Sequence, residues 1–219
     1  MAASSSNDTI LEQLRNGSAQ FELVSSSPVA SISTPNPTPS TILRFFARVG
    51  PPPGGVSSSN SNIKVERFSV HKVTGDGRCM FRALVKGMAR NKGITLTPRQ
   101  ERDNADELRA AVKEVICEDD NERRQYKEAV TAITVDEPLH RYCQRIGRSD
   151  FWGGESELLV LSKLCNQQIV VYIPETEHNS SKRGSGFIPI AEYGAVKKKQ
   201  PRHVVRLLYS GRNHYDLLV

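Results

Sequence analysis

Cys79 stands where the loop "TGDG" passes into a stretch with helical periodicity. One face of that stretch carries the apolar residues at i, i+3, i+4 and i+7, namely Phe81, Leu84, Val85 and Met88. The unpaired N–H groups and positive dipole end of a helix start favour a thiolate and lower the pKa of a cysteine there. Gly75 and Gly77 permit a tight loop whose N–H groups could form an oxyanion hole. The pattern predicts a reactive thiol if a base is near; otherwise Cys79 is a structural cysteine.

A base is available at the end of the chain, where His214 opens an apolar strand directly after a turn. Asp216 follows at i+2, so its side chain lies on the same face of the strand and could fix the tautomer of His214 and stabilise the imidazolium. Asn213 is the fallback orienter if the strand begins one residue later. A buried histidine–aspartate pair can also be purely structural. The other four histidines lie in positions less suited to reach the thiol.

The elements that would position these residues alternate between strand and helix patterns. A strand is predicted at 67–73, and a helix beginning at "TPRQ", with threonine as N-cap, proline next and glutamine at N3. Further helices are expected at about 121–133, 137–146 and 155–165. Strands are expected at 168–173, 187–190 and 203–209, followed by a final strand from His214 to the end. The sequence thus predicts an α+β domain with a helical block packed on a mostly antiparallel sheet.

Residues 1–61 differ from the rest in composition. They hold most of the prolines and several serine runs, and the first lysine is Lys64. Such sequence buries too little apolar surface to offset the entropy of ordering it, so we expect a largely disordered region followed by one domain at 62–219. An organelle transit peptide is the less favoured alternative, because acidic residues balance the arginines.

Charge and cysteine usage narrow the class of protein. The net charge is +6, with basic residues dispersed except for "KKKQPR", which we interpret as a solvated loop, so no nucleic-acid partner is expected. No apolar run is long enough to span a membrane. The cysteines have neither C-x-x-C nor zinc-finger spacing, and we expect four reduced thiols and no metal in a cytosolic or nuclear monomer. The four are Cys79, Cys117, Cys143 and Cys165.

Three segments together resemble the ovarian-tumour (OTU) family of cysteine proteases. "DGRCMFR" is similar to the family's D-G-x-C-[LMF]-[FY]-R motif, "WGGESEL" to its W-G-G-x-x-E-L segment, and "HYD" to its closing strand. The resemblance covers about residues 65–219, with the motifs in the family's order. It implies a papain-like α+β fold and a deubiquitinase that hydrolyses ubiquitin from conjugates or polyubiquitin chains without a cofactor.

The resemblance also implies roles for individual residues. Cys79 would be the nucleophile, His214 the general base and Asp216 its orienter. Asp76 would hold the oxyanion loop or lie near the imidazole, with the backbone at Gly77 and Arg78 completing that loop. His214 would deprotonate the thiol or hold it as an ion pair.

The remaining residues of the resemblance are expected to shape the site. Trp152 would be an architectural ring packed near the active-site helix. The ubiquitin tail is basic, so its channel should be acidic, with Asp150, Glu155 and Glu157 as candidates. The alternatives are a catalytically silent ubiquitin-binding module, an isopeptidase for another ubiquitin-like modifier, or an unrelated thiol enzyme.

Overall fold

The computed structural model describes residues 64–178, 184–194, 203–211 and 213–219. The predicted disordered region at 1–61 and the basic run at 197–202 lie outside these residues. Within them, no helix has the length and apolar character that crossing a membrane would need.

The helices account for most of the first half of the described chain. Helix α3 (Cys79–Asn91) begins at the cysteine, as predicted, and α4 (Pro98–Lys113) begins with the predicted capping box between Thr97 and Gln100. The other elements of the helical block follow in chain order: η1 (Glu114–Glu118), α5 (Asp120–Arg123), η2 (Arg124–Tyr126), α6 (Lys127–Asp136), α7 (Leu139–Ile146) and α8 (Glu155–Leu164). A short α9 (Glu175–His178) lies later in the chain, outside the helical block.

Five strands form one sheet in the order β1-β5-β4-β2-β3. They are β1 (Val70–His71), β2 (Ile169–Pro174), β3 (Phe187–Tyr193), β4 (Val205–Ser210) and β5 (His214–Leu218). Only the β2–β4 pair is parallel among these strands, so the predicted mostly antiparallel sheet is observed.

The predicted strand at 67–73 is reduced to two residues because the chain crosses the outer face of the sheet. Glu66 bridges to Phe187 on β3, whereas Val70 pairs with Leu218 on β5, towards the other edge of the sheet. Between them, the ring of Phe68 packs against that of Tyr172 on β2, with centroids 5.3 Å apart. A segment that runs across several strands cannot also hydrogen-bond along one of them.

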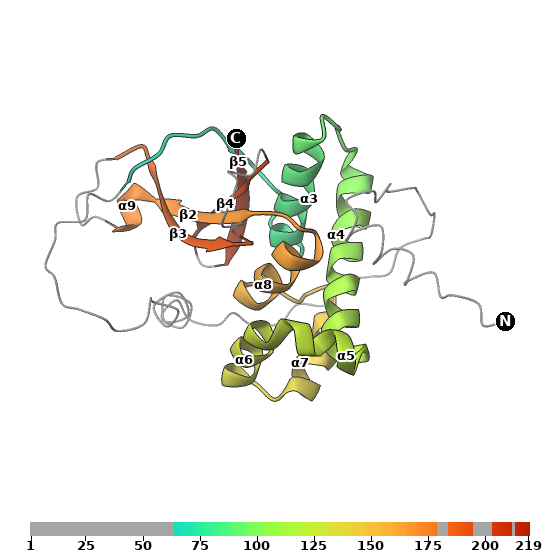
Figure 1. The fold of residues 1–219 in the computed structure, drawn as a ribbon. Helices are drawn as coiled ribbons and strands as arrows, with labels where there is room; N and C mark the ends of the chain where they lie inside the picture. The colour runs from blue at the N-terminus through green and yellow to red at the C-terminus, as the bar shows by residue number, and fades with distance from the viewer. Residues whose placement is uncertain (1–63, 179–183, 195–202, 212) are drawn as a thin grey trace, which may run out of the picture.

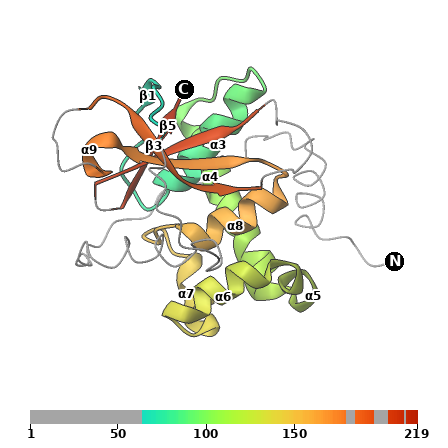
Figure 2. The ribbon, with the colours of Figure 1, turned by 60° about the vertical axis from the view of Figure 1, so that its left-hand side comes forward.

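Helices α3 and α8 lie between the sheet and the rest of the helical block (Figures 1 and 2). Helix α3 contacts β4 and β5, while α8 contacts β3 as well as α4 and α6. The main core fills this interface with fully buried side chains of both layers, including Phe81, Leu161 and Leu207. The packing sets the start of α3, with Cys79, against the start of β5, with His214.

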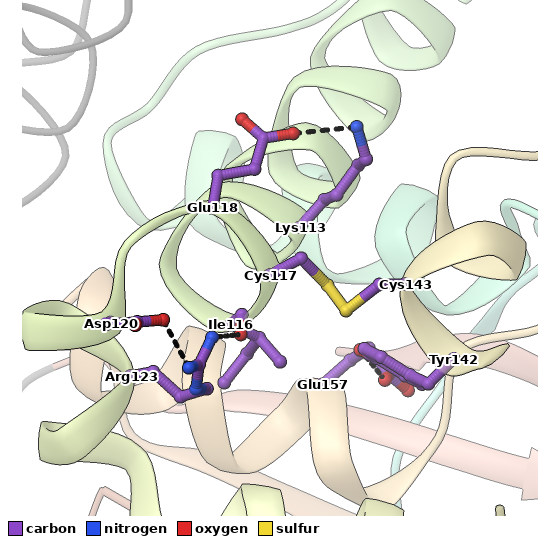
Figure 3. The surroundings of a disulfide bond; sticks show 9 residues. All are labelled: Lys113, Ile116, Cys117, Glu118, Asp120, Arg123, Tyr142, Cys143 and Glu157. Atoms are coloured by element: carbon purple, nitrogen blue, oxygen red, sulfur yellow. Dashed lines mark hydrogen bonds and ion pairs between the residues drawn. A yellow bond between two sulfur atoms is a disulfide. The ribbon is translucent and has the colours of Figure 1, made fainter. Parts of the chain in front are cut away.

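Two of the cysteines expected to be reduced thiols form a disulfide. Cys117 in η1 and Cys143 in α7 are joined, with Cα atoms 5.6 Å apart (Figure 3). Their 26-residue separation gave no recognisable motif, because the pairing depends on α7 folding back against the end of α4. Cys79 and Cys165 are the free cysteines of the described chain.

Candidate active site

The sulfur of Cys79 lies at the junction of α3 and β5. Its side chain is buried, and Sγ donates a hydrogen bond of 3.7 Å to the carbonyl oxygen of Asn213. The backbone N–H groups of Tyr215 and Met80 also face the sulfur, and both lower the pKa of the thiol. The two residues that flank His214, Asn213 and Tyr215, therefore contact the cysteine that lies about 135 positions earlier in the chain.

His214 and Asp216 are paired as the i, i+2 spacing predicts. Nε2 of His214 lies 3.0 Å from Oδ1 of Asp216, whose side chain is completely buried. The same Oδ1 accepts a 2.9 Å hydrogen bond from the backbone N–H of Val73, and Oδ2 pairs with Nζ of Lys72 at 2.8 Å. Asn213 lies in the turn and meets the sulfur through its backbone carbonyl, so the observed partner of the imidazole is Asp216.

The other nitrogen of His214 faces the loop that precedes Cys79. A β-carbon at Gly75 would lie 3.8 Å from Nδ1 of His214. Because Nε2 is bound to Asp216, Nδ1 is the atom available to exchange a proton with a group that lies between His214 and the loop before Cys79. The imidazole is partly exposed, with 27% of its side-chain surface accessible to solvent.

The expected lowering of the Cys79 pKa is wrong. The pKa of the thiol is raised to about 11, chiefly by burial, and the nearby carboxylates of Asp76 and Asp216 contribute to that rise. The N–H groups at the helix start act in the opposite direction but are outweighed, because desolvation disfavours the charged form of a buried group. At neutral pH Cys79 is therefore a protonated thiol, which favours deprotonation by His214 during the reaction over a standing thiolate–imidazolium pair.

Asp76 holds the loop before Cys79 and does not contact the imidazole. Its Oδ1 accepts a 2.9 Å hydrogen bond from the backbone N–H of Arg78, the local bond expected from the sequence. Its Oδ2 pairs at 2.9 Å with the guanidinium of Arg82, which also reaches Glu101 on α4. The role of Arg82 was missed, although it is the last residue of the DGRCMFR motif, three positions after Cys79 on the same helix.

The expected oxyanion donors already have acceptors within the loop. The N–H of Asp76 bonds to the carbonyl of Thr74, that of Arg78 to the Asp76 side chain, and that of Cys79 to the Asp76 carbonyl at 3.0 Å. Gly77 carries the loop N–H for which no acceptor is found in the described part of the chain. Donation to an oxyanion from the N–H of Asp76, Arg78 or Cys79 would require these bonds to be shared or exchanged, whereas that of Gly77 would not. The oxyanion hole at residues 76–79 stays a prediction.

Trp152 is not the packed ring that the sequence predicted. It is 44% exposed, whereas its neighbour Phe151 is buried against Tyr142. The adjacent Gly153 does allow the predicted close approach, since a β-carbon there would lie 2.5 Å from the Met80 side chain. An aromatic ring at the surface beside the start of α3 is available to contact substrate.

The three candidates for an acidic channel have different surroundings. Asp150 accepts two hydrogen bonds of 3.0 Å from the guanidinium of Arg148. Glu157 is buried, where it accepts hydrogen bonds from Tyr142 and from the Gly154 backbone. Glu155 is half-buried, its pKa is raised by burial, and no ion-pair partner for it occurs among the described residues. Glu155 is thus the carboxylate best placed to receive a cation.

The fold and the cysteine–histidine–aspartate arrangement define a cysteine protease. No group of three or more potential metal-binding side chains occurs in the described ranges.

Comparisons with known proteins give the family. The model of the "OTU-like cysteine protease" family matches residues 74–215. The chain is 61% identical to OVARIAN TUMOR DOMAIN-containing deubiquitinating enzyme 3 of Arabidopsis thaliana, over 98% of both chains. It is 34% identical to deubiquitinating enzyme 4 of the same plant, over 69% of this chain and 43% of that protein. The chain belongs to the OTU-like cysteine protease family.

Solved OTU domains are similar to this chain at lower identity. The Hazara virus OTU bound to ubiquitin is 22% identical, with a TM-score of 0.48 over 74% of this chain and 92% of that chain. The viral OTU domain protease from Qalyub virus is 19% identical, with a TM-score of 0.48 over 69% of this chain and 83% of that chain.

Proposed function

We propose that this protein is a deubiquitinating thiol isopeptidase that hydrolyses ubiquitin from conjugates or polyubiquitin chains. The observation that carries the proposal is the meeting of the buried Cys79 sulfur with the β5 segment that holds the His214–Asp216 pair. The chain is 61% identical, over nearly its full length, to a protein named as a deubiquitinating enzyme, and this similarity supports ubiquitin as the modifier.

The reaction begins with proton transfer from Cys79 to the imidazole of His214. The sulfur attacks the carbonyl carbon of the terminal glycine of ubiquitin, and the electron pair of the carbonyl moves to its oxygen. When the tetrahedral intermediate collapses, the C–N bond breaks and His214 gives its proton to the departing lysine amine. Water, deprotonated by the same imidazole, then hydrolyses the thioester and restores the thiol. Asp216 keeps His214 oriented throughout.

A ubiquitin probe with an electrophilic C-terminus tests this function directly. We expect covalent labelling of the purified protein, and loss of labelling in Cys79→Ala. Cys165→Ala is the matched control, because Cys165 is the other free cysteine of the described chain and is partly buried. This control should label like the wild type.

The same experiment separates the alternatives. Binding of ubiquitin without labelling would indicate a silent ubiquitin-binding module. Labelling only by probes built on another modifier would indicate an isopeptidase for that modifier. A cytosolic or nuclear location, a monomeric state and a role of Glu155 in receiving the basic tail of ubiquitin belong to the same proposal.

A further inference from the structure

Arg109 of α4 reaches from the helical block to the loop that carries Cys79. Its Nη2 donates a 3.1 Å hydrogen bond to the carbonyl oxygen of Gly77, and its Nη1 donates a 2.9 Å bond to the carbonyl oxygen of Arg148. The side chain is almost completely buried, and its guanidinium lies 5.3 Å from the centre of the Phe81 ring. A planar guanidinium can bind two carbonyls at fixed angles, which the point charge of a lysine cannot.

The two carbonyls belong to segments that are packed tightly together. A β-carbon at Gly77 would lie 2.6 Å from the carbonyl oxygen of Ser149 and 2.9 Å from that of Phe151. The loop at 74–78, here called the catalytic loop, therefore presses against the 148–151 segment with Arg109 joining the two. Two carbonyl oxygens of the 148–151 segment thus lie close to Gly77, and the guanidinium binds the carbonyls of Gly77 and Arg148.

The bond to Gly77 fixes the orientation of one peptide group. In a trans peptide the C=O and the N–H point in opposite directions. The Gly77–Arg78 peptide is held at both ends: Arg109 binds its carbonyl, and Oδ1 of Asp76 accepts its N–H. Asp76 is itself held by Arg82. Rotation of this peptide would break bonds on both sides.

We propose that Arg109 is a positioning residue of the thiol centre, which holds the Gly77–Arg78 peptide beside Cys79 in one orientation. Without Arg109 the Gly77 carbonyl is left buried without a donor, which is energetically unfavourable and therefore favours rotation of the peptide. Rotation would carry the carbonyl toward the face where the loop N–H groups lie, and would place a partial negative charge near the developing oxyanion. The proposal rests on the proposed function.

Steady-state hydrolysis of a fluorogenic ubiquitin C-terminal amide by Arg109→Met and Arg109→Lys is the first test. Misplacing a catalytic group by a small distance can cost about 10²-fold, so we expect kcat of Arg109→Met to fall by about that factor with KM little changed. Arg109→Lys can donate to one of the two carbonyls and should fall by about tenfold. In Arg109→Ala, added methylguanidinium should restore part of kcat, whereas methylammonium should not.

Arg123→Met is the matched control for a general loss of stability. Arg123 also donates to a backbone carbonyl, that of Ile116 at 3.1 Å, but it lies in the α5 part of the helical block. We expect a lower melting temperature and an unchanged kcat. Wild-type kcat in both Arg109→Met and Arg109→Lys, or an equal loss of kcat in Arg123→Met, would overturn the proposal.

Hydrogen exchange separates this proposal from the proposed function. The amides of Arg78 and Cys79 should exchange faster in Arg109→Lys than in the wild type, even if the wild type does not cleave ubiquitin conjugates. Unchanged exchange at these amides would overturn the positioning role. An inactive wild type with faster exchange in the variant would instead contradict the function alone.

Discussion

Replacement of Asp216 by asparagine separates two contributions of this carboxylate, its geometry and its charge. Oδ1 of Asp216 forms hydrogen bonds with both His214 and the Val73 N–H, while Oδ2 pairs with Lys72. An asparagine oxygen in the place of Oδ1 keeps the first two bonds. Its NH2 group then faces the Lys72 ammonium, whose side chain is 78% exposed and can turn into solvent. We therefore expect Asp216→Asn to preserve the orientation and tautomer of His214.

The cost of losing the charge follows from the strength of the hydrogen bond to the imidazolium. A bond to a charged group contributes about 1.5–3 kcal/mol and a neutral one about 0.5–1.5 kcal/mol. The difference of about 1–1.5 kcal/mol corresponds to about a five- to tenfold loss of kcat/KM. Asp216→Ala removes the bond entirely, so we expect a loss of about 10²-fold. It also leaves the Val73 N–H buried without an acceptor, which lowers the free energy of unfolding by about 1–3 kcal/mol.

The assay is hydrolysis of a fluorogenic ubiquitin amide by wild type, Asp216→Asn and Asp216→Ala, with the folded fraction of each measured by circular dichroism. Equal losses in the two variants would refute the reasoning, because they would show that the charge of Asp216 matters and the retained bonds do not. Wild-type activity in both would show that His214 needs no orienter.

Three further predictions concern the thiol, a buried acid and the disulfide. Because the pKa of Cys79 is raised to about 11, chiefly by burial, its alkylation by iodoacetamide in a Cys165→Ala background should still be accelerating with pH at about pH 10, while a plateau near pH 7 would reveal a standing thiolate. Tyr142→Phe removes the 2.6 Å hydrogen bond to buried Glu157, whose pKa is raised by burial. An acid whose pKa is raised by folding contributes stability that is present below its ordinary pKa of 4.5 and lost as the pH rises. In urea unfolding, the free energy of unfolding of Tyr142→Phe should therefore be about 1–3 kcal/mol below that of the wild type at pH 7, and this difference should shrink toward about pH 5. A difference that does not change with pH would contradict this assignment. Reduction of Cys117–Cys143, separated by 26 residues, should lower the free energy of unfolding by about 3.5 kcal/mol, and a Cys143→Ser variant should not respond to reductant.

Local sequence patterns were sufficient to predict the helices and strands whose ends are marked by particular residue types. The capping box at Thr97 predicted the start of α4, and apolar periodicity predicted α3 with Cys79 at its first residue. The alternation from His214 to the end predicted β5 and the side-chain pair on one of its faces. These features depend on contacts between residues a few positions apart, which is why a single sequence carries them.

Contacts between distant segments were not predictable in the same way. The segment at 67–73 has the alternation of a strand, but its Phe68 and Val70 cover the outer face of the sheet. The cysteines at 117 and 143 carry no spacing signal, because only the return of α7 to the end of α4 brings them together. Trp152 looked like a core residue by its type, yet the packing of its neighbours leaves it at the surface.

The sequence by itself determined the types of the reacting groups, their order and the elements that carry them, because helix starts and strand faces are set by neighbouring residues. Tertiary structure decided the state of those groups. It buries Cys79 deeply enough to keep the thiol protonated, brings Lys72 to Asp216, and places Arg109 against Gly77. Burial and long-range hydrogen bonds depend on how whole layers pack, and no local pattern encodes them.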